Sequence, residues 1–176
     1  VKNRAPRAGD GIAVTIDKPS TDADGDKIAY RYRWYRFGQE MEAHKDRTEL
    51  KPADIKKGDT WAVTVAAHDG DVDGDKVSET IAVVNTKPEA GELEVTPKAP
   101  GRLDKPVCTI VKKASDADGD TLKTKIAWYR NGKSAAGGAD DESLAPGSFN
   151  VGDKLKCEVT VTDGEVTAVR RPDDAA

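Results

Sequence analysis

Residues 20–26 read STDADGD and residues 28–36 read IAYRYRWYR, and this stretch decides the fold because the chain carries it twice. The second copy reads SDADGD at residues 115–120 and IAWYR at residues 126–130. Self-similarity at a fixed spacing indicates repeated structural units. We therefore expect two copies of one small domain.

The spacing between the copies sets the expected domain boundaries. Asp22 and Asp116 are equivalent and lie 94 positions apart, and no gap interrupts this spacing from there to the last strands. A chain of 176 residues holds two small cores more readily than one large core. We expect the first domain at residues 1–86 and the second at residues 87–176.

The start of the chain has a second internal match, at a different spacing. Residues 1–9 (VKNRAPRAG) resemble residues 83–91 (VVNTKPEAG), which lie where the first repeat ends. We interpret both segments as linkers between domains, because proline restricts the chain to extended conformations. On this interpretation another repeat precedes residue 1, and the second repeat carries twelve extra residues within 93–106. The first repeat would then have a reduced first strand.

Composition excludes two classes of partner. The formal net charge is −4 and the sequence pI is about 5.3. A general nucleic-acid binder needs a basic surface that displaces counterions from phosphate, so we expect no nucleic-acid partner. No apolar run approaches the roughly 20 residues that span a bilayer, so we expect no membrane insertion.

Apolar and polar residues alternate along several runs, which is typical of half-buried strands. Tyr30, Tyr32 and Trp34 form one apolar face, with Arg31 and Arg33 on the opposite side. Helical periodicity does not extend over ten residues anywhere in the chain. Each repeat offers six or seven short strands separated by turns, which predicts an all-β fold of two tandem antiparallel sandwiches. The core tryptophans would be Trp34 and Trp128.

Two cysteines flank the second tryptophan. Cys108 precedes the strand with Trp128 and Cys157 follows it, which is the order seen in immunoglobulin domains, where a bridge between the sheets packs against a tryptophan. The equivalent positions in the first repeat hold Val14 and Val63, so a valine contact would replace the bridge there.

The chain resembles the immunoglobulin-like repeats of secreted and surface proteins of bacteria. The shared features are the DADGD segment, the Trp-Tyr pair, a Gly-Asp before the penultimate strand and an Asp-Gly after it. Cadherin-like and PKD-like repeats are similar in their acidic loops. The resemblance implies immunoglobulin-like domains, and export of such repeats implies a disulfide between Cys108 and Cys157.

The resemblance also implies a role. It favours a non-catalytic spacer, stalk or adhesive module, extracellular or at the cell surface, often with calcium. Its partners would be neighbouring repeats of the same chain and a cell-surface protein or glycan. The alternative is a carbohydrate-binding accessory module of a secreted hydrolase, which a planar row of exposed aromatic side chains would support.

The acidic loops are the candidate site. Hard carboxylate oxygens at this density suit Ca²⁺, which takes six to eight oxygen ligands. Asp and Gly also make tight turns without any metal, and both interpretations stay open. In an immunoglobulin-like domain the BC and FG loops share one end, and we expect the seven acids of the first repeat to bind calcium better than those of the second. The candidate ligands are Asp22, Asp24, Asp26, Asp69, Asp71, Asp73, Asp75, Asp116, Asp118, Asp120 and Asp163.

No enzymatic machinery is readable from the sequence. His44 and His68 have no Cys or Ser partner at motif spacing, so we expect no catalytic or zinc role for them. Tyr35 and Tyr129 recur on the outward side of equivalent strands, where they pack under the next segment or stack on a sugar.

Overall fold

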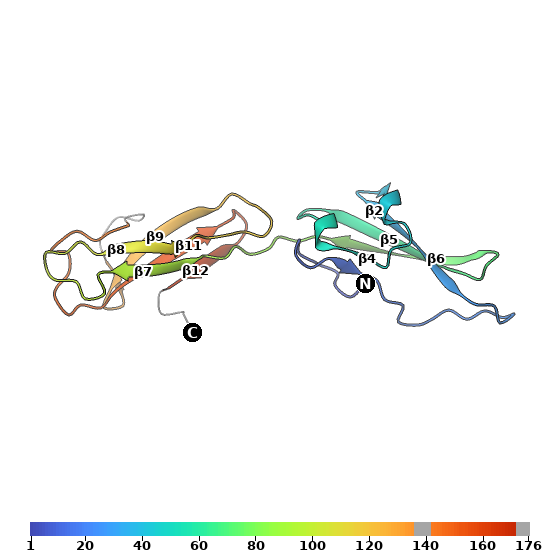
Figure 1. Ribbon diagram of the computed structural model, residues 1–176, viewed down its shortest axis with the longest axis horizontal. Helices are drawn as coiled ribbons and strands as arrows, with labels where there is room; N and C mark the ends of the chain where they lie inside the picture. The colour runs from blue at the N-terminus through green and yellow to red at the C-terminus, as the bar shows by residue number, and fades with distance from the viewer. Residues whose placement is uncertain (136–141, 172–176) are drawn as a thin grey trace. The chain divides into compact units, whose positions relative to one another are not determined.

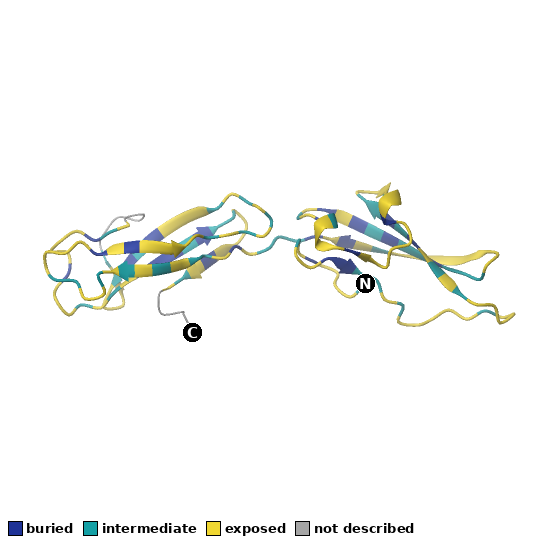
Figure 2. Cartoon of the chain, viewed as in Figure 1, coloured by how far each residue is buried: buried dark blue, intermediate teal, exposed yellow. Residues whose placement is uncertain are grey.

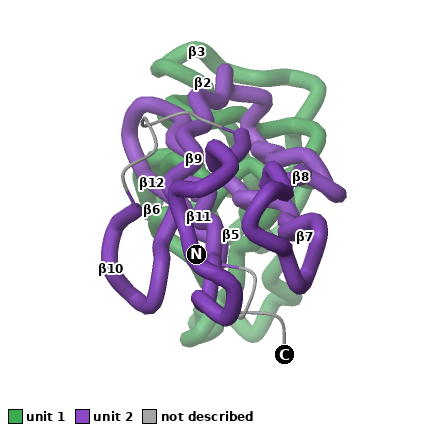
Figure 3. Tube along the Cα trace, turned by 90° about the vertical axis from the view of Figure 1, so that its left-hand side faces the viewer, with its two compact units in different colours: residues 1–86 green, residues 87–176 purple. Residues whose placement is uncertain are grey.

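A computed structural model describes residues 1–135 and 142–171 of the chain. It divides into two compact units, Val1–Thr86 and Lys87–Ala176, which Figure 3 colours separately. Within the described residues the regular elements are β-strands and two short 3₁₀ helices. No helix in this part of the chain has the length and apolar character needed to cross a membrane.

Unit 1 contains two antiparallel sheets (Figure 1). The larger sheet has the order β3-β2-β5-β6, and the smaller one pairs β1 with β4. The elements are β1 (Ile12–Ala13), β2 (Ala29–Arg36), β3 (Gln39–Glu40), η1 (Glu42–His44), β4 (Glu49–Leu50), η2 (Pro52–Asp54), β5 (Thr60–His68) and β6 (Asp73–Ala82).

Unit 2 repeats the larger sheet of unit 1, but its smaller sheet pairs different strands. Its larger sheet has the order β10-β9-β11-β12, and its smaller sheet pairs β7 with β8. The elements are β7 (Glu92–Thr96), β8 (Val107–Lys112), β9 (Lys123–Arg130), β10 (Lys133–Ser134), β11 (Leu155–Thr162) and β12 (Thr167–Arg170).

The strand order confirms the predicted fold class. Each larger sheet corresponds to strands C′, C, F and G of an immunoglobulin-like domain, and the smaller sheets supply strands A, B and E. Trp34 is opposite Val63 in unit 1, and Trp128 is opposite Cys157 in unit 2. Strands C and F therefore pair in the same register within each unit. The chain is all-β and forms two tandem immunoglobulin-like antiparallel sandwiches.

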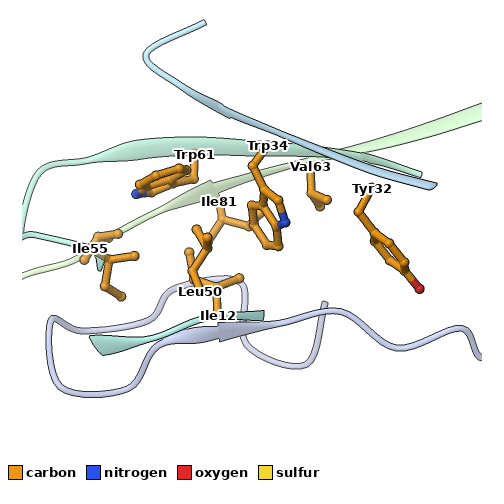
Figure 4. Packing of buried hydrophobic residues seen from close by; sticks show 9 residues of the cluster. Ile12, Tyr32, Trp34, Leu50, Ile55, Trp61, Val63 and Ile81 are labelled. Carbon is orange, nitrogen blue, oxygen red and sulfur yellow. The ribbon is translucent and has the colours of Figure 1, made fainter. Parts of the chain in front are cut away.

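The core of unit 1 lies between its two sheets, as Figure 4 shows. Ile12 and Leu50 come from the smaller sheet and pack toward side chains of the larger one. Trp34 and Trp61 are almost fully buried and meet edge to face, with ring centroids 6.3 Å apart. The alternation read from the sequence produces this core, because burial alternates along β2, where Tyr32 and Trp34 are buried; Figure 2 colours the chain by burial.

The core of unit 2 contains the predicted disulfide. Cys108 on β8 is bonded to Cys157 on β11, so the bridge joins the two sheets. Trp128 is buried within the same cluster. The disulfide prediction is confirmed.

The interpretation of residues 1–9 as a linker is wrong. Asp10 caps a turn by accepting a hydrogen bond from the Arg7 N–H (2.9 Å), and Asp104 caps the same turn by accepting one from Gly101 (2.7 Å). Asp10 and Asp104 are 94 positions apart, and so are Arg7 and Gly101. The Lys2 N–H donates to the Ala13 carbonyl, which places Lys2 where Thr96 pairs with Val107 in unit 2.

The spacing of 94 therefore extends back to the first residue, and unit 2 contains no twelve-residue insertion. Residues 1–9 resemble residues 83–91 at a spacing of 82 because Asn, Pro and Gly recur both in turns and in linkers. This resemblance does not reflect structural equivalence. Val1 and Lys2 occupy the place of Val95 and Thr96, the last two residues of β7.

Candidate functional site

The acidic BC segments are built as identical turns in the two units. Oδ1 of Asp22 accepts hydrogen bonds from the backbone N–H groups of Asp24 (2.8 Å) and Asp26 (3.1 Å). Oδ1 of Asp116 accepts the equivalent bonds from Asp118 (2.8 Å) and Asp120 (3.3 Å). The first Asp of each DADGD segment thus holds the turn, as the turn interpretation expects.

The second unit brings its three BC carboxylates together. Asp116, Asp118 and Asp120 each offer a carboxylate oxygen, and these oxygens all lie within 4.8 Å of one another. All three residues are half-buried. Among the described residues, Oδ2 of Asp116 is shielded from solvent and accepts no hydrogen bond. One oxygen of Asp116 therefore holds the turn while the other is left for a further partner.

In unit 1 two of the FG acids, Asp69 and Asp73, already have other partners. Asp69 accepts hydrogen bonds from the N–H groups of Asp71 and Val72, each 2.8 Å long. The backbone bonds from Val72 and then Asp71 lower the pKa of Asp69 below its ordinary value. Asp73 forms an ion pair with Arg31 (2.9 Å) and lies 3.2 Å from Nδ1 of His68.

Two of the predicted loop acids are in fact on a strand. Asp73 and Asp75 belong to β6, because β6 continues past a bulge and Asp73 pairs with His68 of β5. A surface groove is nevertheless lined by Asp22, Asp69 and Asp75, so acids of the BC and FG segments do face one region. Asp24, Asp26 and Asp71 are exposed.

The expected preference for unit 1 is therefore not supported by the geometry. Within the described residues, the group whose carboxylate oxygens converge lies in unit 2. Asp163 does not belong to this group, and it caps its own turn by accepting from the N–H groups of Glu165 and Val166, each at 2.7 Å. A count of acids per loop could not reveal which carboxylates already have cationic or turn partners.

A polar cluster around the buried Asp59, which directly precedes β5, was not predicted from the sequence. Asp59 is 3% exposed and accepts hydrogen bonds from Nη2 of Arg36 (2.7 Å), the Lys56 N–H (2.9 Å) and Nε1 of Trp61 (3.2 Å). The carboxylate thus joins the end of β2 to the turn before β5. The sequence does mark this position, because the Gly58-Asp59 pair recurs in the second repeat as Gly152-Asp153.

Asp153 occupies the equivalent position in unit 2. It accepts hydrogen bonds from the N–H of Asn150 (2.8 Å) and from Nδ2 of Asn131 (2.7 Å). These two bonds, the backbone bond being the stronger cause, lower the pKa of Asp153 below its ordinary value. The repeated Gly-Asp motif is therefore a device that fixes the turn before strand F, and its role is structural.

No protein-family model matches the chain, and no curated protein matches its sequence. Among solved structures, a segment of two fibronectin type-III domains from chicken tenascin is similar, with 9% sequence identity and a TM-score of 0.35. The match covers 86% of this chain and 87% of that chain. The immunoglobulin-like fold is defined by the strand order and register of the two units.

Proposed function

We propose that the chain is a non-catalytic structural or adhesive module, extracellular or at the cell surface, in which calcium stabilises the second domain. Neighbouring repeats of the same chain would be its partners, as the resemblance to cadherin-like and PKD-like repeats implies. The proposal combines three features: two copies of one sandwich, a disulfide between sheets, and convergent carboxylates in one BC turn.

The disulfide is the observation that carries the extracellular assignment. Cys108 and Cys157 are both buried and bonded to one another across the two sheets. Such bridges form and persist in oxidising compartments and are rare where cellular thiols stay reduced. A small sandwich with a modest core also gains stability from the bridge, because the cross-link lowers the conformational entropy of the unfolded chain.

The BC turn of unit 2 supports calcium as the ligand. Three carboxylates within 4.8 Å of one another repel, by roughly 1 kcal/mol per close pair even in water. A hard divalent cation converts this repulsion into attraction, and carboxylate oxygens are the ligands that Ca²⁺ prefers. Asp116, Asp118 and Asp120 would hold the ion, with backbone carbonyls and water completing the shell.

The alternative of a carbohydrate-binding module has less support. Sugar-binding surfaces of this kind need exposed aromatic rings in a row. Among the described residues Phe37 is the large aromatic side chain that is clearly exposed, and its ring contacts the Arg36 guanidinium. Tyr35 and Tyr129 are half-buried. No observation therefore favours this function over the structural one.

Single-molecule force spectroscopy of the 176-residue protein tests the proposal. We expect two separate unfolding events, because each unit has its own core. The disulfide closes a loop with a sequence separation of 49 residues. Reductant should therefore increase the gain in contour length at one unfolding event by about 170 Å. Calcium should raise the unfolding force of that same event and leave the other unchanged. A single cooperative event, or two events insensitive to calcium, would contradict the proposal.

A further inference from the structure

The outward face of the larger sheet in unit 1, the side of β2, β5 and β6 turned away from the core, carries an arginine with an unused donor. Tyr32, Trp34 and Val63 point from β2 and β5 into the core (Figure 4), so the residues that alternate with them face outward. Arg33 is one of these, and its side chain is 34% exposed. Its Nε lies 3.5 Å from Oε1 of Glu40, whereas Nη1 is shielded from solvent and has no hydrogen-bond partner among the described residues. A shielded donor without an acceptor costs stability, so a further acceptor would be bound favourably here.

The equivalent row of unit 2 shows what kind of acceptor fits. Arg33 lies opposite Thr64, and the spacing of 94 makes Ala127 and Glu158 their counterparts, which are paired in the same way. Glu158 is 8% exposed, and its Oε2 accepts a hydrogen bond from Nε of Arg171 at 2.6 Å. Unit 2 therefore places a carboxylate on this row of the sheet and binds an arginine with it. Unit 1 has the arginine, but Thr64 stands where the carboxylate would be.

Hydroxyl groups beside Arg33 add to the polar surface. Thr64 lies opposite Ser78 of β6, and their hydroxyl oxygens are 2.8 Å apart. One hydroxyl proton makes this bond, so the other is left to donate to a different acceptor. Lys76 is exposed, lies diagonally across from Thr64 and forms no ion pair within the described part of the chain. A carboxylate above Thr64 would thus have a guanidinium and a hydroxyl as neighbours and an ammonium group within reach of a long side chain.

The other charges on this face leave a positive surplus. Arg31 pairs with Asp73 at 2.9 Å, and its second terminal nitrogen lies 2.7 Å from Nε2 of His68. Among the outward-facing strand residues of unit 1, three cations stand against two carboxylates: Arg31, Arg33 and Lys76 against Asp73 and Glu40. Complementary charge across an interface steers association and excludes partners of the same sign. The face therefore favours an acidic partner.

Tyr35 indicates a polypeptide as the source of the carboxylate. Arg33 and Tyr35 are alternate residues of β2, so their side chains are about 7 Å apart along the strand. Alternate side chains of an extended polypeptide have the same spacing. Tyr35 is half-buried and lies opposite the small Ala62, which leaves part of its ring for an apolar contact. A glutamate held by Arg33 would set an apolar residue two positions away against this ring.

We propose that the outward face of the larger sheet of unit 1 binds an acidic, extended segment of another protein. A glutamate of that segment takes the place that Glu158 has in unit 2, and it accepts hydrogen bonds from Arg33 and from a hydroxyl of the Thr64–Ser78 pair. An apolar residue two positions along the segment packs on Tyr35. This goes beyond the structural role, because it assigns the face a partner of one chemical class.

The test is an NMR titration of the ¹⁵N-labelled 176-residue protein with the peptide TETLT. Chelator is present throughout, so the outcome does not depend on calcium. The amide signals of Arg33, Thr64 and Ser78 should shift and saturate. The peptide TQTLT, in which glutamine replaces the glutamate, should bind at least about fivefold more weakly, because hydrogen bonds to a charged acceptor are the stronger ones. Added salt should weaken binding of TETLT and leave that of TQTLT unchanged.

Three variants identify the site. Thr64→Glu supplies in unit 1 the carboxylate that unit 2 already has, and it should weaken TETLT binding at least about tenfold because the new side chain pairs with Arg33. Arg33→Gln removes the donor and should have the same effect, and a retained spectrum shows that each variant is folded. Lys125→Ala changes the exposed counterpart of Arg31 in unit 2 and should leave binding unchanged.

Several results would overturn the proposal. These are equal binding of the two peptides, unchanged binding by Arg33→Gln, and no saturable shift at residues 33, 64 and 78 with millimolar TETLT. Chondroitin sulfate is the further probe, and if it shifts these signals while TETLT does not, the occupant is an acidic glycan. A dimer that forms without peptide and dissociates in Arg33→Gln would identify a second copy as the occupant. Either of these outcomes also overturns the proposal.

Discussion

The guanidinium of Arg36 donates to the carboxylate of Asp59 across 2.7 Å, and Asp59 is almost fully buried. The ion pair lies beside Trp61, whose indole N–H is a second donor to the same carboxylate. Burying a charge is costly unless it is paired and hydrogen-bonded, and here all three donors converge on one side chain. The larger sheet of unit 1 therefore depends on Asp59 at its end.

Asp59→Ala should destabilise unit 1 by about 2–4 kcal/mol, because Arg36, Trp61 and the Lys56 N–H lose their acceptor together. Urea unfolding, followed by fluorescence of the whole protein, measures the change. Glu42→Ala removes an exposed acid of the same unit and should change stability by less than about 0.5 kcal/mol. Equal effects of the two substitutions would show that Asp59 has no special role.

Acid should weaken unit 2 through Asp153. Its pKa is lowered in the folded state by the bonds from Asn150 and Asn131, so the folded pKa lies below the unfolded value near 3.9. The stabilisation is present above the unfolded pKa and is lost as pH falls through the folded pKa. Asp153→Asn should flatten the pH dependence of unfolding below about pH 4. An NMR titration that places the Asp153 pKa at or above its ordinary value would refute this.

Reductant should act on one unit only. Reducing the Cys108–Cys157 bridge, which closes a sequence separation of 49 residues, should lower the stability of unit 2 by about 4 kcal/mol on the chain-entropy model. Unit 1 has Val14 and Val63 at the same positions and should melt identically with and without reductant. Calorimetry of the wild type and of Cys108→Ser with Cys157→Ser provides the comparison. A change in both transitions would mean that the units do not unfold independently.

The sandwich and its bridge were predictable because their determinants are local and repeated. Alternation places Trp34 and Trp128 inward on equivalent strands, and the order Cys108, Trp128, Cys157 matches the immunoglobulin pattern of a bridge between sheets. The extent of β6 was not predictable, since Asp73 and Asp75 favour turns by composition. The pairing of β6 with β5 across a bulge overrides that preference.

The acidic site shows where reading a sequence fails. The seven candidate aspartates of unit 1 outnumber the four of unit 2, yet the three carboxylates that converge within the described residues lie in unit 2. Arg31 neutralises Asp73, and turn N–H groups occupy Asp69, whereas Oδ2 of Asp116 is left buried and without a hydrogen bond. Such partners come from other strands, so spacing along the chain cannot reveal them.

The two DADGD turns provide a matched pair for measuring the role of calcium. Melting of the 176-residue protein is recorded in millimolar calcium and in chelator, for the wild type and for two double variants. Binding to the folded state alone raises apparent stability by RT ln(1 + [L]/Kd), so calcium should raise the Tm of unit 2 in the wild type.

Asp118→Asn with Asp120→Asn should abolish that rise, while Asp24→Asn with Asp26→Asn, the equivalent change in unit 1, should preserve it. The predicted result is a calcium-dependent Tm that the unit 2 variant alone removes. Identical melting of the wild type in calcium and in chelator would contradict a metal-stabilised module, and the acidic segments would then be turns alone.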